Sequence, residues 1–224
     1  MIDRPSPNHD SRPPGAAIDM LVLHYTGMRT AAAALDRLCD PAAKVSAHYA
    51  IDEDGTVLRL VAEDRRAWHA GVAFWAGSTD INGRAIGIEL VNPGHEFGYR
   101  PFAPAQMAAL VDLAGDLLAR HPIPAGQVLG HSDVAPRRKR DPGELFDWKA
   151  LAAAGIGLWP EDAAPAPPDR TAAIRLLAAI GYETDDPAAS LAAFQRHFRP
   201  ERVDGRLDAP TMGRLRAVTA AAGA

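Results

Sequence analysis

Cysteine is nearly absent from the sequence: Cys39 is the only one in 224 residues. One thiol cannot form an intrachain disulfide, so a small secreted fold held together by disulfides is excluded. A reducing compartment suits such a chain, and we expect the protein to be cytoplasmic. A periplasmic protein whose export signal has been removed is the alternative.

Long apolar runs are missing as well. No run of 18 apolar residues occurs, so the sequence predicts no membrane span. Residues 1–17 are rich in proline and polar side chains, and they lack the apolar segment of a signal peptide. We expect them to form an N-terminal arm that packs on the rest of the protein or stays loose.

A basic excess is also lacking. The chain has 24 Lys+Arg against 28 Asp+Glu, which gives a net charge of -4. Nucleic-acid-binding domains usually carry a surplus of basic residues. The short basic run Arg137–Arg140 is therefore interpreted as part of a loop, and we expect no nucleic-acid partner and a monomer.

The remaining composition, 47% hydrophobic and 23% charged, is that of an ordinary globular protein. Short apolar runs predict strands, and apolar residues spaced three and four apart predict helices. The expected elements are strands at 20–23, 85–91 and 128–130, a hairpin from 46–51 and 56–61, and helices at 31–39 and 104–120. Residues 18–158 should therefore form an α/β domain, with a mixed β-sheet flanked by helices.

A second domain is predicted after a proline-rich break. Residues 159–168 hold four prolines in ten positions, so 159–169 is predicted to be a semi-rigid linker. Residues 170–224 show three apolar helical faces and should form a small three-helix domain. A domain of this size has a marginal core and is expected to lean on the first.

Three parts of the sequence carry side chains suited to catalysis. His24 ends a buried strand, His131 and Asp141 share one loop, and Glu89 lies inside an apolar strand. A catalytic zinc site needs three protein ligands and one open position, which His24, His131 and Asp141 can supply. Beside such a metal, Glu89 would act as general base, and Lys139 would stabilise an oxyanion.

Each of these residues also has a simpler interpretation. His24 fits a core histidine bonded to the backbone, because buried polar groups are usually satisfied in this way. Glu89 fits the solvated face of a strand, since side chains alternate along it. His131 and Asp141 fit caps of the loop between them.

Five segments, taken together and in order, closely resemble the zinc N-acetylmuramoyl-L-alanine amidase family that includes the AmpD and AmiD enzymes. They are Leu21–Thr26, Val45–Asp52, Ala67–Gly71, Ile86–Leu90 and His131–Gly143. The last segment is the most specific, and the resemblance spans roughly residues 18–158.

This resemblance implies hydrolysis of the amide between N-acetylmuramic acid, or its 1,6-anhydro form, and L-alanine of the stem peptide. The partners would be peptidoglycan fragments, and the setting wall recycling or turnover. The resemblance also implies Zn²⁺ at His24, His131 and Asp141, with Glu89 and Lys139 as catalytic residues. It further implies that Trp68 and His69 contact the substrate.

The C-terminal segment resembles a small three-helix peptidoglycan-binding domain. The resemblance rests on Leu176–Tyr182, on Ala193–Arg196 and on the pair Asp204-Gly205 followed by Thr211. The alternative is a helical appendage that only stabilises the first domain.

Three other functions compete with the amidase hypothesis. A wall-recognition protein without catalysis would be expected to lack a metal ligand, whereas His24, His131 and Asp141 form a complete set. A zinc peptidase would instead cut within the stem peptide. Nucleic-acid binding through Arg137–Arg140 is weakly supported at this net charge.

Overall fold

The computed structural model describes residues 1–161 and 163–223. Residue 162 of the expected linker and residue 224 of the expected C-terminal domain lie outside the described residues. The strands are β1 (Ile2–Asp3), β2 (His9–Ser11), β3 (Met20–Tyr25), β4 (Tyr49–Ile51), β5 (Val57–Arg59), β6 (Arg65–Ala67), β7 (Ala85–Leu90) and β8 (Val128–Gly130). The helices are α1 (Ala31–Cys39), α2 (Ile81–Arg84), α3 (Gly94–Phe97), α4 (Pro104–Arg120), α5 (His131–Val134), α6 (Trp148–Ala153), α7 (Arg170–Ile180), α8 (Pro187–Phe198) and α9 (Ala209–Ala222), with a short 3₁₀ turn at Ala125–Gln127.

The main sheet is mixed, as the sequence predicts, in the order β1-β5-β4-β7-β3-β8. Strand β5 pairs antiparallel with β4, and the other neighbouring pairs are parallel. Because β7, β3 and β8 run the same way, their carboxyl ends meet at one edge of the sheet. In open parallel sheets this edge is where ligands bind.

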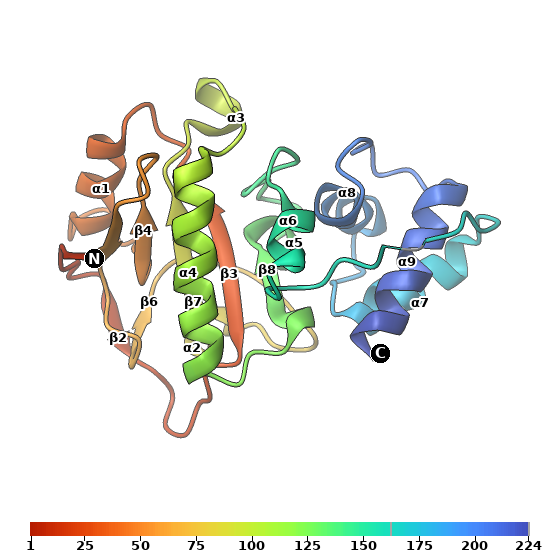
Figure 1. Cartoon of the computed structure of the whole chain (residues 1–224). Coiled ribbons are helices and arrows are strands. Elements are labelled where there is room, and N and C mark those ends of the chain that lie inside the picture. The colour runs from red at the N-terminus through yellow and green to blue at the C-terminus, as the bar shows by residue number, and fades with distance from the viewer. Residues whose placement is uncertain (162, 224) are drawn as a thin grey trace.

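One face of the sheet is covered by α4, which lies in front of β7 and alongside β3 in Figure 1. The helix begins with Pro104 at its first position, where a missing N–H costs nothing. Its buried residues Leu110, Leu113 and Leu117 pack on Leu21 and Leu23 of β3 and on the matching face of β7. The alternation of β3 then directs Met20, Val22 and His24 to the opposite face.

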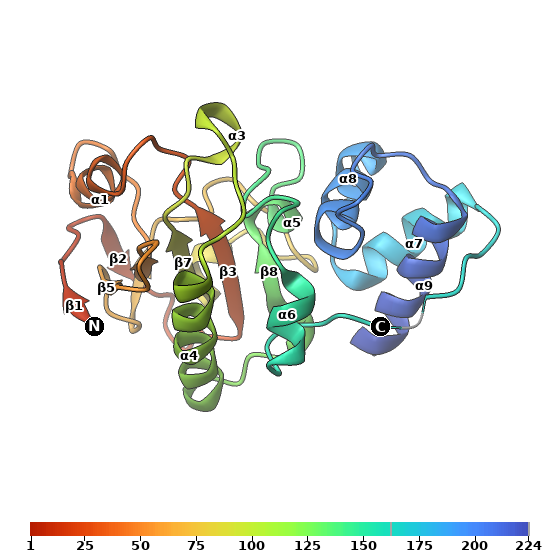
Figure 2. The same ribbon diagram turned by 45° about the horizontal axis from the view of Figure 1, so that its top comes forward.

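The opposite face packs against the C-terminal helices. Met20 and Val22 belong to one buried cluster with Trp75 and with Phe194 of α8. Figure 2 shows α8 beside α5, with α7 and α9 farther from the sheet. The three-helix unit is therefore joined to the first domain through a continuous apolar core.

Residues 1–17 are built into the first domain. Strand β1 pairs with β5 in the main sheet, and β2 pairs antiparallel with β6. Arg12 reinforces this placement, because its guanidinium donates to the carbonyl of Ala85 at 2.9 Å. The segment is thus a structural part of that domain.

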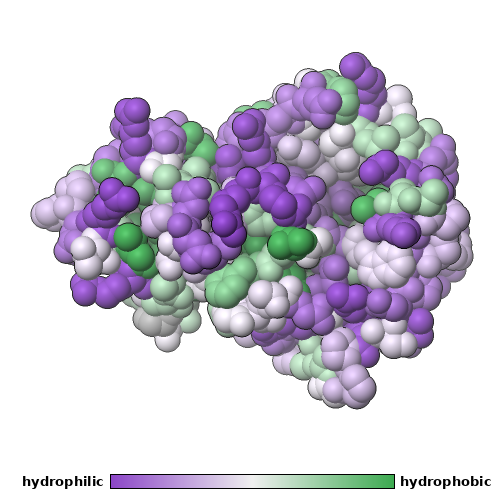
Figure 3. Space-filling view, turned by 180° about the vertical axis from the view of Figure 1, so that it is seen from behind, coloured by the Kyte–Doolittle hydropathy of each residue, from purple (hydrophilic) through white to green (hydrophobic). Residues whose placement is uncertain are grey.

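The side of the molecule seen in Figure 3 is largely polar. Figure 3 shows hydrophilic residues over most of one side of the molecule, with apolar residues in small patches. Among the described residues, no helix combines the length and apolar character needed to span a membrane.

Candidate functional site

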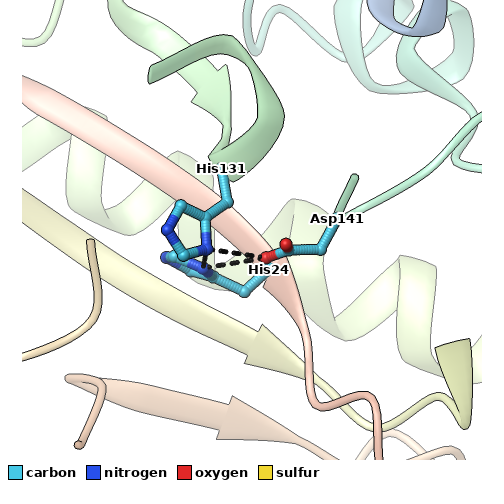
Figure 4. Close-up of side chains that lie close together, drawn as sticks. All are labelled: His24, His131 and Asp141. Atoms are coloured by element: carbon cyan, nitrogen blue, oxygen red, sulfur yellow. Dashed lines mark hydrogen bonds and ion pairs between the residues drawn. The ribbon is translucent and has the colours of Figure 1, made fainter. Parts of the chain in front are cut away.

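Three buried donor atoms converge at the carboxyl edge of the sheet. His24 lies near the end of β3, His131 directly follows β8, and Asp141 follows in the loop after α5. The Nδ1 atoms of His24 and His131 are 2.9 Å apart, and Asp141 Oδ2 lies 3.1 and 2.9 Å from them. Figure 4 shows the two imidazoles and the carboxylate directed at one point. Ligand atoms around a tetrahedral zinc ion stand roughly 3.3 Å apart, so this triangle is compatible with a metal ion.

In both imidazoles, Nε2 points away from the three converging atoms and contacts another residue. Nε2 of His131 donates to the carbonyl of Ala70 at 3.0 Å. Nε2 of His24 lies 3.1 Å from Nδ1 of His69. Contacts of this kind fix the tautomer of a metal-binding histidine and leave the opposite nitrogen free for the metal.

The protonation states also suit a metal site. Burial, and then the neighbouring His131, lowers the pKa of His24 to about 4, so its ring is neutral near pH 7. Burial alone would raise the pKa of Asp141, but the two imidazoles outweigh it and hold that pKa well below its usual range. A neutral imidazole and an ionised carboxylate are the forms that bind metals.

Glu89 lies beside this group on β7. The parallel register pairs it directly with His24, so both side chains leave the same face of the sheet. Burial, and then the Asp141 carboxylate, raises the pKa of Glu89 to about 8, while Lys139 opposes the shift. Its Oε2 is shielded from water and has no hydrogen-bond partner among the described residues. A carboxyl group in this setting can hold and release a proton near neutral pH.

An open cleft of about 430 Å³ leads to these residues. Glu89, His131 and Asp141 lie in its wall together with Lys139 and Trp68. The structure thus brings the sequence-predicted site residues to one place.

His69 also borders the cleft, and its ring packs against that of His24. Only 8% of the residue is exposed, and the two rings meet edge to face with centroids 5.1 Å apart. Burial, and then the nearby His24, keeps the pKa of His69 well below its usual range. The substrate contact predicted at His69 stays a prediction; in the structure its ring contacts His24 and can orient it.

Several supporting residues are not identifiable from sequence motifs. Asn82 accepts from the backbone N–H groups of His69 and Ala70 at 3.1 and 2.8 Å. Arg138 donates to the Ala70 carbonyl at 2.9 Å. These contacts fix residues 69 and 70, which in turn contact the imidazoles of His24 and His131. The partners are distant in the sequence, so only the structure reveals them.

A cleft that combines a metal-compatible group with a proton-carrying carboxyl group is typical of metal-dependent hydrolases. Comparisons with known proteins narrow this class. Residues 14–144 match the profile of the family described as N-acetylmuramoyl-L-alanine amidase. The chain belongs to this family.

The individual relatives agree with this assignment. N-acetylmuramoyl-L-alanine amidase AmiD of Escherichia coli is 38% identical over 222 residues, covering 87% of this chain and 79% of the relative. The 1,6-anhydro-N-acetylmuramyl-L-alanine amidase AmpD of Enterobacter cloacae is 36% identical over 66% of this chain and 87% of its own. The crystal structure of AmpDh3 from Pseudomonas aeruginosa has a TM-score of 0.83 at 37% identity, covering 93% of this chain and 94% of that one.

These findings confirm the predicted activity and fold. The protein is an amidase that hydrolyses the bond between N-acetylmuramic acid and L-alanine of the stem peptide, in the recycling of the wall. The predicted mixed sheet with flanking helices is likewise that of the family's solved structures.

Proposed function

We propose that the amidase depends on Zn²⁺ held by His24, His131 and Asp141. The observation that carries this proposal is the triangle of two Nδ1 atoms and one Oδ2 atom, each pair 2.9–3.1 Å apart and buried. Two imidazoles and one carboxylate form a donor set that suits zinc and leaves one position open. When bound, Zn²⁺ would polarise the scissile carbonyl and lower the pKa of the attacking water.

Glu89 is proposed as the general base and acid. Its carboxylate would take the proton of the attacking water and then deliver it to the nitrogen of the departing L-alanine. Burial raises the pKa of Glu89, which favours the protonated form that the second step requires. Lys139, in the cleft wall, would offset the negative charge that develops on the carbonyl oxygen.

The substrate is proposed to be a peptidoglycan fragment, with the 1,6-anhydro form included. One relative is named a 1,6-anhydro-N-acetylmuramyl-L-alanine amidase. The E. coli AmiD structure, at TM-score 0.82 and 36% identity, is described as a complex with anhydro-N-acetylmuramic acid-L-Ala-D-gamma-Glu-L-Lys. Trp68, which lines the cleft here, would contact the sugar or the first peptide residues.

The test of this function is digestion of defined muropeptides, with and without the anhydro sugar, followed by mass spectrometry. Zinc-loaded protein should release an intact stem peptide beginning at L-alanine, and a chelator should stop the release. Fragments cut within the stem would instead indicate a peptidase. Full activity in protein proven free of metal would contradict the zinc proposal, and the ratio of the two rates gives the preference for the anhydro sugar.

The C-terminal helices are proposed to bind the wall. A groove of about 440 Å³ runs between α7, α8 and the segment 205–207, with Leu191 and Arg206 in its lining. Together with the resemblance of this segment to peptidoglycan-binding domains, the groove supports the proposal. Cosedimentation with purified sacculi should fall in Arg206→Glu, and equal retention of variant and parent protein would contradict it.

We further infer a cytoplasmic location from the single cysteine. Fractionation of the native host with an antibody against the protein tests this inference. Recovery with periplasmic markers would support the alternative.

A further inference from the structure

Helix α8 of the C-terminal domain contacts both ends of the loop that carries two of the three proposed metal ligands. This loop, residues 131–144, begins with His131 and includes Asp141. Two consecutive residues of α8 are involved, and both are buried: Arg196 is 9% exposed and His197 is 2% exposed. Neither residue has a role in the proposed chemistry.

The first contact is made at Asp133, two residues after His131 and fully buried. Its Oδ2 accepts from the backbone N–H of Gly130 at 2.7 Å and from Nδ1 of His197 at 2.7 Å. Its Oδ1 accepts from the hydroxyl of Tyr182 at 2.6 Å. A buried carboxylate is costly unless donors satisfy it, and two of these three donors belong to the C-terminal domain.

Asp133 fixes the backbone next to His131 through its side-chain hydrogen bond to Gly130. Its bond to Gly130 closes the turn from β8 into α5, and His131 is the first residue of that helix. The next N–H, of Ser132, donates to the carbonyl of Asp141 at 2.9 Å. A change in the position of Asp133 is therefore transmitted to His131 and, through Ser132, to Asp141.

The second contact is made at Glu144, three residues after Asp141. Arg196 forms an ion pair with Glu144 at 3.6 Å, and Glu144 also lies 3.1 Å from Nε2 of His95. Nδ1 of His95 is 2.9 Å from the hydroxyl of Tyr25, the residue after His24. The same helix is thus connected to the neighbourhood of all three proposed ligands.

The orientation of the His197 ring is itself fixed. Trp148 of the first domain stacks on one side at 3.7 Å between centroids, and Phe198 lies at 3.9 Å. The donor to Asp133 is therefore held in one direction.

We propose that His197, with Tyr182, is a positioning residue for the metal site: the C-terminal domain acts through Asp133 to set the geometry of His131 and Asp141. This inference rests on the proposed function, because it takes these residues to be metal ligands. It assigns the domain a task within the amidase site that is separate from wall binding.

The test compares three full-length variants by zinc affinity, measured on apo protein in competition with a chromophoric chelator, and by the visible spectrum of the Co²⁺-loaded protein. His197→Phe keeps a flat ring between Trp148 and Phe198 but removes the donor. His197→Asn keeps a donor near the position of Nδ1 but loses the stacking. Gln195→Ala is the control, because Gln195 lies on the same helix, is fully buried and bonds only within its own domain.

Removal of a group that orients a metal ligand typically weakens metal binding by about 10–100-fold. Since Asp133 lies between His197 and the ligand, we expect about tenfold weaker zinc binding and an altered Co²⁺ spectrum in His197→Phe. His197→Asn should restore both to near the parent values. Gln195→Ala should lower thermal stability and leave both unchanged.

Parent-like affinity and spectrum in His197→Phe would overturn the inference. Equal losses in His197→Phe and Gln195→Ala would also overturn it, since the effect would then be general destabilisation. Should His197→Phe not fold, Tyr182→Phe removes the other donor and is expected to shift the Co²⁺ spectrum in the same way. If the parent protein itself binds no zinc, the proposed metal site fails, and that outcome is distinct from a failure of the positioning role.

Discussion

At the scale of single residues, the site depends on a glycine, Gly87, as well as on the proposed metal ligands. Gly87 lies on β7 two residues before Glu89, and a Cβ atom there would stand 2.4 Å from the His69 ring. The ring occupies this space and meets both His24 and His48 edge to face. The absence of a side chain at Gly87 thus leaves the space that the His69 ring occupies next to the strand.

Gly87→Ala is therefore expected to displace His69 and disturb His24. Overpacking of a tight core usually costs about 1–3 kcal/mol, and zinc affinity should fall together with the free energy of unfolding. Gly115→Ala is the matched control, because Gly115 lies in α4 with open space around its Cβ position and should stabilise the helix. Calorimetry and a zinc titration of both variants check this, and unchanged zinc affinity in Gly87→Ala would contradict the role given to His69.

Glu89→Gln is expected to separate catalysis from metal binding. The amide has the size of the carboxyl group but cannot take up the water proton, so kcat should fall by about 10²–10⁴-fold. Zinc content should stay at the parent level because Glu89 is not among the converging donor atoms. The measurements are muropeptide turnover and metal analysis on the same sample; undiminished turnover would remove Glu89 from the mechanism.

His48 should make the protein sensitive to acid. Burial, and then the adjacent Arg12, lowers the pKa of His48 to about 3 from 6.5. Between these two pH values the unfolded chain binds a proton that the folded protein does not. The free energy of unfolding should therefore fall on acidification from pH 6.5, with a contribution from His48 of up to about 1.4 kcal/mol per pH unit.

The variant His48→Asn tests this dependence. Its side-chain oxygen can replace Nδ1 of His48, which accepts from the N–H of Gly87 at 3.0 Å, but it does not titrate. Urea unfolding between pH 7 and 4.5 should show a shallower loss of stability in the variant. Parallel curves for variant and parent protein would show that another group sets the slope.

At the scale of elements, the sequence patterns predicted the strands and helices well because each of these elements is determined mainly by its own local pattern of apolar residues. The apolar runs of β3, β7 and β8 are buried on both faces, and α4 spans the predicted residues 104–120. Register is a different matter. The pairing of His24 with Glu89 is set by strands 65 positions apart in the chain, and no local pattern encodes it. The candidate residues were therefore predictable from chemistry and resemblance, while their arrangement was not.

Helix α4 is joined to the sheet by Gln106 in its first turn. The residue is fully buried, and its Nε2 donates at 2.8 Å to the carbonyl of Ile51, the last residue of β4, and at 3.0 Å to that of Val91, the residue after β7. Gln106→Leu should cost about 1–3 kcal/mol, because it leaves a buried carbonyl without its donor. The exposed Asp116→Ala on the same helix should change stability by less than about 0.5 kcal/mol. Equal unfolding curves for the two variants would show that the hydrogen bonds contribute little.

At the scale of the whole molecule, the amino-acid composition changes at the proline-rich segment 159–169. The helices that follow this segment nevertheless pack against the first domain. Ala166, within this segment, is 8% exposed and its N–H donates to the carbonyl of Ala209 at the start of α9. Gly181, at the end of α7, approaches Trp75 so closely that a Cβ atom would lie 2.6 Å from the indole. Sequence composition predicts the linker. It does not predict that the C-terminal helices fit the surface of the first domain, because both surfaces form only on folding.

The shared core leads to a prediction about cooperativity. Phe194 of α8 is fully buried and belongs to the same cluster as Val22 of the central strand β3. Loss of one unit would expose apolar surface of the other, at about 25 cal/mol for each Å², so the two should unfold together. Calorimetry of the parent protein is expected to show a single transition whose calorimetric and van't Hoff enthalpies agree.

Two alanine substitutions, one in each domain, then test whether the domains unfold together. Phe194→Ala in the C-terminal helices and Ile86→Ala in β7 each remove a fully buried side chain, with losses of about 2–5 kcal/mol. For a chain of this length each kcal/mol lowers Tm by roughly 2–4 °C, so both variants should shift the same transition by about 10 °C. A trace that splits, with Phe194→Ala lowering one component and Ile86→Ala the other, would mean that the domains unfold independently. Helix α8 would then detach before the first domain melts, and the support it gives Asp133 would be lost at a temperature where the sheet is still intact.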